Sequence, residues 1–359
     1  MKLALVLCLS LLLAAALITM LPRSTRAQAQ LYANGPLPAV PIPIDNPMTD
    51  NKINLGKQLY FDGRLSSDGT ISCASCHEPT RAWADPGQRV SAGVGHKLGG
   101  RNAPSVINAA YIIPQFWDGR AIQLEKQAVG PPLNPIEMDL TQEELEYRLN
   151  HIPGYVTQFQ EVFGARPNLD LTAKAIATFE RTVIVTDTPF DRYMAGDRSA
   201  LSPAAERGMH VFNGKGHCSV CHSGPAFSDS RYHNVGVGYA NGKYSDVGRY
   251  DVTKNPKDMG AFLTPKLRDV EFTPPYMHDG SEPTLQSVID MYDRGGIPNP
   301  NLDQAMVPLG LTKQEKADLL VFLATGLSAP YPVVEPPPLP DPEITAQQLR
   351  AMYQGGEAK

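Results

Sequence analysis

The sequence predicts a mainly α-helical protein with two similar domains, long loops and little β-structure. Three observations support this prediction. The pentapeptide Cys-x-x-Cys-His occurs twice, at 73–77 and 218–222, and each copy follows a segment with helical periodicity. The length of 359 residues suits two domains. The 33 prolines and 30 glycines are typical of long, shaped loops rather than of a bundle with short connections.

Each pentapeptide has the form of a c-type haem attachment site, in which two thiols bind the porphyrin and the histidine ligates the iron. A redox dithiol and half a zinc site are the alternatives for Cys-x-x-Cys alone. The adjoining histidine and the recurrence favour two covalently bound haems, and no other cysteine outside the first ten residues is left for a disulfide. The candidate haem-binding residues are Cys73, Cys76, His77, Cys218, Cys221 and His222.

The N-terminal 29 residues have the pattern of a secretory signal. Lys2 precedes an apolar run from 3 to 21, and Arg23, Arg26 and an alanine-rich segment follow it. We expect cleavage near residue 29, although an apolar run of about 20 residues also suits a retained anchor. Export agrees with haem chemistry, because c-type haem is attached outside the bacterial cytoplasm, so the expected compartment is the periplasm.

Beyond such an anchor we expect no integral membrane role. The formal net charge of −5 gives no electrostatic reason to expect a nucleic-acid partner.

The first predicted domain spans 51–198, after a proline-rich segment at 30–50 that should run extended. Its first helix should begin near Asn51 and end before Gly63. Between the two pentapeptides, Thr141 and Glu144 form the pattern of a capping box, which predicts a helix start there. A further helix is expected to begin at Thr172.

The second predicted domain spans 199–328. The segment 223–270 is expected to form loops with a short hairpin, and 329–359 a proline-rich tail that wraps the protein or stays mobile. Helices are expected to begin at Ser202-Pro203, at Thr284 and at Thr312, the last with Glu315 as its capping-box partner.

Four further segments resemble the bacterial di-haem cytochrome c peroxidase family. The resemblance covers most of the chain from about 50 to 327, with the motifs in family order. It implies two cytochrome c-like haem domains, an N-terminal peroxidatic one and a C-terminal electron-transfer one, in an enzyme that acts on hydrogen peroxide. The segments are Arg101-Asn102-Ala103-Pro104, Phe116-Trp117-Asp118-Gly119-Arg120, Asn134-Pro135-Ile136-Glu137-Met138 and Thr273-Pro274-Pro275-Tyr276-Met277-His278-Asp279-Gly280.

Within this family the chain looks more like the MauG branch, because of the residue at position 292. Conventional members ligate the C-terminal haem with a methionine fourteen residues after the histidine of His-Asp-Gly, and counting from His278 gives Tyr292. A tyrosinate ligand favours ferric and higher-valent iron, whereas methionine raises the potential. The alternative is a core tyrosine on an apolar helix face, with Met291 or Met277 as the sulfur ligand.

The resemblance also implies that peroxide binds at the His77 haem. Glu137, twenty residues after Trp117, corresponds to the family's acid/base carboxylate, and Gln127 and Pro131 correspond to distal-pocket residues. A carboxylate can take the proton of bound peroxide and return it to the departing oxygen. The alternative for Glu137 is a carboxylate at a helix entry.

Further residues have implied roles around the haems. Trp117 matches the family residue between the haems, where an indole can relay an electron. Asn102, Thr273 and Pro275 match positions that hold a calcium ion through oxygen ligands.

Two histidines are ambiguous. His96 lies on a loop where family members often place a distal ligand, but its spacing to Asn102 is short, so we favour an open first haem. His278 is interpreted as a residue between the haems or beside a ligand.

The function expected from these features is a periplasmic di-haem peroxidase, MauG-like, that uses hydrogen peroxide to oxidise a protein partner. Its high-valent haem chemistry would extend to modification of a residue on that partner. One alternative is a conventional cytochrome c peroxidase, which reduces peroxide to water with electrons from a small cytochrome or a copper protein. Another is a non-catalytic di-haem electron carrier or redox sensor, against which Gln127 and Glu137 argue.

Overall fold

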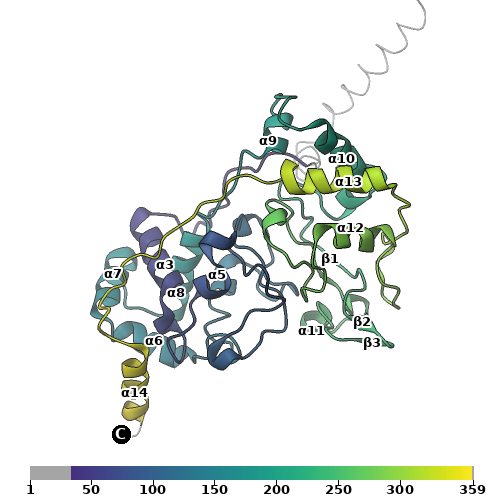
Figure 1. Cartoon of the computed structure of the whole chain (residues 1–359). Helices are drawn as coiled ribbons and strands as arrows, with labels where there is room; N and C mark the ends of the chain where they lie inside the picture. The colour runs from purple at the N-terminus through teal and green to yellow at the C-terminus, as the bar shows by residue number, and fades with distance from the viewer. Residues whose placement is uncertain (1–33, 358–359) are drawn as a thin grey trace, which may run out of the picture.

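Helices supply most of the regular structure, and strands are short and few, in this computed structural model, which describes residues 34–357 (Figure 1). This confirms the prediction of a mainly helical fold with little β-structure. The predicted secretory signal lies outside the described residues. Within the described part of the chain, no helix is long and apolar enough to cross a membrane.

The first hydrophobic core lies among helices α3 to α8, with Leu55, Leu59 and Trp83 at its centre. The predicted first helix is confirmed as α3. Helix α7 was not predicted, because it begins at a proline without a polar cap. The bounds are α3 Asp50–Phe61, α4 Cys73–Cys76, α5 Leu124–Ala128, α6 Gln142–Asn150, α7 Pro153–Phe163 and α8 Leu169–Glu180.

The predicted helix start at Thr172 is wrong. Helix α8 begins three residues earlier, because the side chain of Asn168 caps it by accepting from the Leu171 amide at 2.9 Å. The predicted helix start at Thr141 is confirmed, since this residue is the N-cap of α6, but only half of the capping box forms. The Thr141 hydroxyl accepts from the Glu144 amide, but the Glu144 carboxylate pairs with the buried Arg148 at 2.6 Å instead of returning to residue 141.

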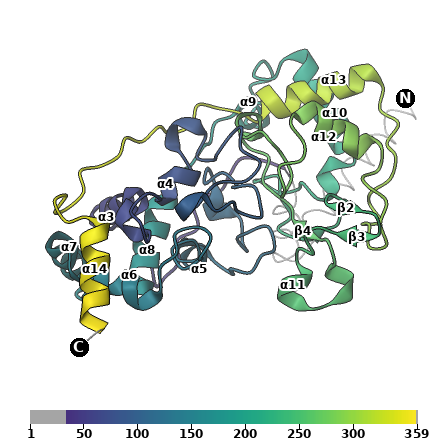
Figure 2. The ribbon, with the colours of Figure 1, turned by 60° about the horizontal axis from the view of Figure 1, so that its bottom comes forward.

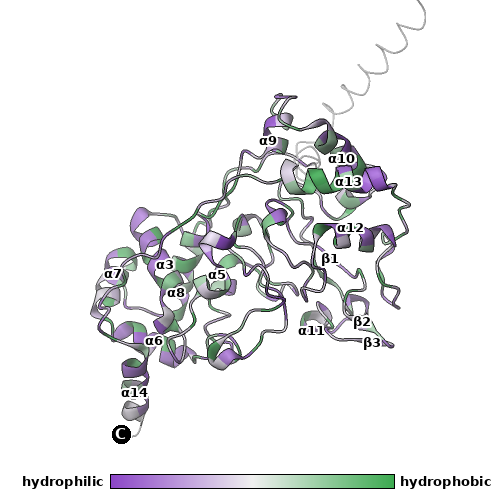
Figure 3. Cartoon of the chain, viewed as in Figure 1, coloured by the Kyte–Doolittle hydropathy of each residue, from purple (hydrophilic) through white to green (hydrophobic). Residues whose placement is uncertain are grey.

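The second hydrophobic core contains helices α10, α12 and α13. Their predicted N-caps Ser202, Thr284 and Thr312 are confirmed, as is the capping box of Thr312 with Glu315. Figure 3 shows hydrophobic and hydrophilic residues on the same helices, as expected where one face is buried. The bounds are α9 Pro189–Met194, α10 Pro203–Asn213, α11 Tyr250–Thr253, α12 Leu285–Asp293 and α13 Lys313–Val321, which continues as a π-helical turn over Phe322–Gly326.

Within residues 34–357, four two-residue strands form two small antiparallel pairs. β2 (Tyr239–Ala240) and β3 (Lys243–Tyr244) form the predicted short hairpin. β1 (Tyr232–His233) pairs with β4 (Phe262–Leu263), and the paired residues His233 and Phe262 are 29 positions apart in the sequence. The β1–β4 pair lies close to Trp117, whose carbonyl accepts from the Leu263 amide at 2.8 Å.

The C-terminal tail leaves the second core and crosses to the first, as both ribbon views show (Figures 1 and 2). The Trp83 indole donates to the carbonyl of Pro332 at 2.7 Å, and Arg64 donates to the carbonyl of Asp341 at 2.9 Å. The tail ends in helix α14 (Ala346–Glu357), which places Leu349 fully inside the first core. The tail therefore wraps the protein, and α14 is a helix that the sequence did not predict.

Each core contains a helix pair that crosses at a glycine. A Cβ atom at Gly56 of α3 would overlap the carbonyl of Ala175 in α8, and one at Gly208 of α10 would overlap the carbonyl of Asp318 in α13. Only glycine allows such close approach of two backbones. The two pairs precede and follow their Cys-x-x-Cys-His motifs in the same order, as a duplicated unit requires.

The Gly208 contact leads to a stability prediction. Gly208→Ala should lower the free energy of unfolding by about 1–3 kcal/mol, because α10 and α13 must separate to admit the methyl group. Gly355→Ala is the matched control. No atom lies within 4 Å of the added Cβ there, so it should leave stability unchanged or raise it by up to about 1 kcal/mol. Denaturant unfolding measures both, and equal effects of the two substitutions would refute the crossing.

Candidate functional site

The second Cys-x-x-Cys-His motif opens into a cavity of about 280 Å³. Cys218, Cys221 and His222 line it after α10. The His222 Nδ1–H donates to the carbonyl of Phe227 at 2.9 Å, which leaves Nε2 to bind a metal. Burial lowers the pKa of His222, so the ring is in the neutral form that ligates metals. Apolar side chains form much of the wall: Phe212, Leu285, Ile289, Leu311, Leu319 and Leu323.

Tyr292 enters the same cavity from the last turn of α12. Burial raises the pKa of its hydroxyl well above the usual value, and the nearby Cys221 and Cys218 add to the effect. Tyr292, Cys218 and Cys221 thus line one cavity. Burial of this kind keeps a phenol protonated unless a cation offsets the lost hydration.

The methionines considered as alternatives lie in different places. Met291 is fully buried and does not line the cavity, whereas Met277 does. Met306 also lines it, from a loop after α12, and no motif in the sequence pointed to this residue. A cavity with two thiols, a neutral imidazole, apolar walls and an opposing phenol or thioether fits a haem.

The first motif forms α4, with His77 at its C-terminal cap. The Tyr60 hydroxyl donates to the carbonyl of His77 at 2.8 Å. The His77 Nδ1 atom is buried without a hydrogen-bond partner, and burial lowers the pKa of the ring to about 4. A neutral imidazole with an unsatisfied nitrogen, beside two thiols, fits a ligand for haem iron.

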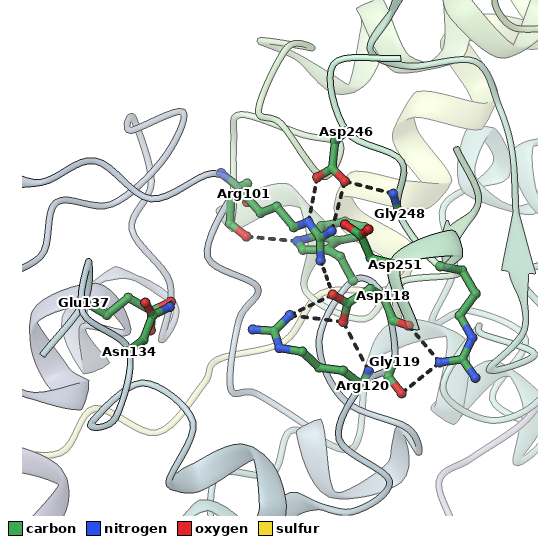
Figure 4. A network of polar contacts seen from close by, with 12 residues as sticks. Arg101, Asp118, Gly119, Arg120, Asn134, Glu137, Asp246, Gly248 and Asp251 are labelled. Carbon is green, nitrogen blue, oxygen red and sulfur yellow. Dashed lines mark hydrogen bonds and ion pairs between the residues drawn. The ribbon is translucent and has the colours of Figure 1, made fainter. Parts of the chain in front are cut away.

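Glu137 lies near this motif, on the loop between α5 and α6. Its half-buried carboxylate accepts from the Asn134 amide group at 2.7 Å (Figure 4). Burial raises the pKa of Glu137, although the bond from Asn134 opposes the rise. Burial also raises the pKa of the Cys73 and Cys76 thiols, and the charge of Glu137 contributes. The carboxylate therefore bonds to Asn134 and does not cap α6, whose N-cap is Thr141.

The two other predicted pocket residues are on the same stretch of chain. Gln127 is half-buried on α5, and Pro131 is half-buried in the turns that follow it. The exposed His96 lies on a 3-10 turn at Val94–His96, whose backbone is tied to the same loop because the Val94 amide donates to the carbonyl of Glu137 at 2.8 Å.

Trp117 and His278 contact each other in the cavity of the second motif. Their rings are edge to face with centroids 6.4 Å apart, and both line the cavity. The Trp117 indole donates to the carbonyl of Asn102 at 2.9 Å. His278 is buried, stacks on Phe262 at 3.5 Å, and has an Nε2 atom without a hydrogen-bond partner.

The predicted calcium positions Asn102, Thr273 and Pro275 all line this cavity. The Asn102 amide nitrogen donates to the carbonyls of Gln88 and Arg89, which leaves Oδ1 to bind a cation. Among the described residues, no cluster of three or more His, Cys, Asp or Glu side chains could hold a metal ion. A cation here would depend on amide, hydroxyl and carbonyl oxygens, which suit calcium.

One ion-pair cluster, centred on His233, was not predicted from the sequence. Its Nδ1 lies 2.7 Å from Asp303 and its Nε2 lies 3.0 Å from Asp229. The bond to Asp229 is the main cause that raises the pKa of His233 to about 11. His233 is therefore charged beside the second motif, and its partner Asp303 is 70 residues away, which is why no local pattern revealed it.

Comparisons with known proteins identify the family of this chain. Residues 50–199 match the family model described as di-haem cytochrome c peroxidase. A protein named cytochrome-c peroxidase IdrP1 from Pseudomonas sp. (strain SCT) is 40% identical over 353 residues, which cover 90% of this chain and 93% of that protein. The methylamine utilization protein MauG of Methylorubrum extorquens is 39% identical over 302 residues, covering 83% of this chain and 84% of MauG.

A solved structure extends the likeness to the fold. The crystal structure of a MauG-like protein associated with microbial copper homeostasis superposes with a TM-score of 0.74 at 33% identity, covering 86% of this chain and 95% of that one. Paired haem-binding motifs, a half-buried carboxylate near the first and a tyrosine in the cavity of the second thus occur in a chain that aligns almost end to end with such enzymes. The chain belongs to the di-haem cytochrome c peroxidase family, and it is an oxidoreductase with haem cofactors that acts on hydrogen peroxide.

Proposed function

We propose that this protein is a MauG-like di-haem peroxidase of the periplasm that passes the oxidising power of hydrogen peroxide to a protein partner. The observation that supports this most strongly is that Tyr292 shares a cavity with His222, Cys218 and Cys221. Iron would supply the cation that lets the buried phenol ionise. An anionic oxygen ligand favours oxidised iron, which suits a site that stores oxidising equivalents.

The two cores would be two cytochrome c-like domains, at 51–198 and 199–328. In the first, Cys73 and Cys76 would hold a haem covalently and His77 would ligate its iron. In the second, Cys218 and Cys221 would hold a haem covalently. His222 and Tyr292 would both ligate its iron. The helix pairs that cross at Gly56 and Gly208 support this duplication. Calcium at Asn102, Thr273 and Pro275 would join the two domains.

Glu137 would move the proton of peroxide. When bound, the haems supply the electrons that reduce hydrogen peroxide to water, with two electrons and two protons consumed per molecule. The Glu137 carboxylate would accept a proton from one peroxide oxygen and return it to the other, which leaves as water. Its raised pKa favours this exchange, and the bond from Asn134 orients it. Gln127 and Pro131 shape the pocket, and Trp117 carries charge between the haems.

A conventional cytochrome c peroxidase is the second candidate. Met277 and Met306 line the cavity of the second motif and offer the sulfur that such an enzyme uses. Its reductant would be a small cytochrome or a copper protein. The third candidate, an electron carrier or redox sensor, needs neither Glu137 nor an open first haem.

Two measurements on the purified holoprotein separate the three functions. One equivalent of peroxide should change the absorption of both haems, and turnover with a reduced small cytochrome should be slow, because the second haem favours oxidised iron. Rapid turnover would assign the protein to the conventional peroxidases. A resting spectrum with only low-spin haem and no response to peroxide would leave the carrier as the function.

A further inference from the structure

Arg101 joins segments that belong to the two halves of the protein (Figure 4). Its guanidinium donates two hydrogen bonds to Asp246, at 2.7 and 2.9 Å, and a third to Asp118 at 2.6 Å. Asp118 directly follows Trp117, whereas Asp246 follows the β2–β3 hairpin, 145 residues from Arg101. All three side chains are at most 20% exposed. Arg101 thus forms a largely buried, bidentate ion pair with Asp246 and a second ion pair with Asp118.

Asp118 is the centre of this cluster. Besides Arg101, it accepts from the backbone amide and the guanidinium of Arg120, at 3.1 and 3.0 Å. Arg249 of the second half donates to the carbonyls of Asp118 and Gly119 at 2.9 and 3.0 Å. Arg101 and Arg249 therefore connect the turn that carries Trp117 to the second half, and only Arg101 does so through carboxylates of both halves. Arg120 bonds Asp118 from within the same turn and makes no such connection.

The indole is held by residues next to this cluster. Its Nε1–H donates to the carbonyl of Asn102, which follows Arg101 directly, and the Trp117 carbonyl accepts from Leu263 of β4. A shift of Arg101 would thus move the acceptor of the indole, and a shift of Asp118 would move its backbone.

The same guanidinium also contacts the ring stack that contains His278. It lies over the ring of Phe262, 5.6 Å from the centroid, and Phe262 stacks on His278 with an interplanar angle of 13°. His278 in turn meets the edge of Trp117. Arg101 is therefore linked to the indole along two routes, one through Asp118 and Asn102 and one through Phe262 and His278.

We propose that Arg101 is a positioning residue that sets the place of the Trp117 indole between the two halves and thereby the rate of charge transfer between the haem sites. The rate of charge transfer depends on Arg101 because moving the Trp117 indole by about an ångström would change that rate steeply. This inference rests on the proposed function for its kinetic part. Its structural part, the placement of the indole, stands independently.

Arg101→Lys is the test variant. Lysine keeps the positive charge, so neither Asp118 nor Asp246 is left without a cation, but it lacks the planar fork that binds both carboxylates. Arg120→Lys is the matched control, because Arg120 bonds the same Asp118 and makes no contact with Asp246. Thermal unfolding of each holoprotein establishes that the variants fold.

The first readout is the indole itself. With 5-fluorotryptophan in place of both tryptophans, ¹⁹F spectra contain one resonance from Trp117 and one from Trp83, the only tryptophans in the chain. Arg101→Lys should shift the Trp117 resonance and leave that of Trp83 unchanged, whereas Arg120→Lys should leave both near their original positions. An unchanged Trp117 resonance in Arg101→Lys would overturn the proposal.

The second readout is stopped-flow absorption after peroxide is mixed with the ferric holoprotein. Arg101→Lys should slow the change at the second haem by about 10- to 100-fold, the cost of a small misplacement, while the initial change at the first haem keeps its rate. Equal slowing of both steps, or no slowing, would refute the kinetic part. If the wild-type protein shows no change at the second haem while the ¹⁹F shift is present, the proposed function fails and the positioning role stands.

Discussion

Replacing Glu137 by glutamine should lower the rate of reaction with hydrogen peroxide by about 10²–10⁴-fold, the usual contribution of a positioned acid/base group. Glutamine keeps the size of the side chain and can still bond to Asn134, but it cannot accept and return a proton. Glu143→Gln is the matched control, because that carboxylate is exposed in the first turn of α6. Stopped-flow absorption at several peroxide concentrations gives the rate constants.

The pH dependence provides a second check on Glu137. The carboxylate must be ionised to accept a proton, so the rate should fall as the pH drops through its pKa. Burial raises that pKa, so the fall should begin at a higher pH than for an ordinary glutamate. The dependence should disappear in Glu137→Gln. A glutamine variant with the rate and pH profile of the wild type would exclude Glu137 as the acid/base group.

Replacing Tyr292 by methionine should raise the reduction potential of the second haem by on the order of 100 mV or more, since axial ligands set haem potentials over a wide range. A neutral thioether stabilises ferrous iron relative to an anionic phenolate. Tyr276→Phe is the control, because this tyrosine lines the same cavity and is also shielded from water. Spectroelectrochemical titration measures both variants, and a potential that moves in neither, or equally in both, would contradict ligation by Tyr292.

Local signals predicted the helices best. Ser202, Thr284 and Thr312 were correct as N-caps because capping depends on a few adjacent residues. The start at Thr172 was wrong because Asn168 offers an equally good cap one turn earlier. Helix α14 was missed because it is stabilised by Leu349 in a core formed by residues nearly 300 positions earlier, such as Leu55.

The site residues divide in the same way, into those that a sequence pattern indicates and those that only the fold brings together. Spacing within a known family pointed to Tyr292 and Glu137. Tyr292 lines the cavity of the second Cys-x-x-Cys-His motif, and Glu137 is a half-buried carboxylate with a raised pKa. The pairing of Arg101 with Asp246 and of His233 with Asp303 has no local signature, because ion pairs across long sequence separations form only when the fold brings them together. Met306 was missed because its place in the cavity likewise depends on the fold and not on neighbouring residues in the sequence.

Electron paramagnetic resonance of the resting ferric protein, before and after Tyr292→Phe, tests the central claim most directly. The claim is that the two motifs hold haems of different kinds, one open beside Glu137 and one closed by Tyr292. The wild type should give a high-spin signal from the first haem and a low-spin signal from the second. Tyr292→Phe should alter only the low-spin signal. A low-spin signal that is unchanged in Tyr292→Phe would show that another residue closes the second haem.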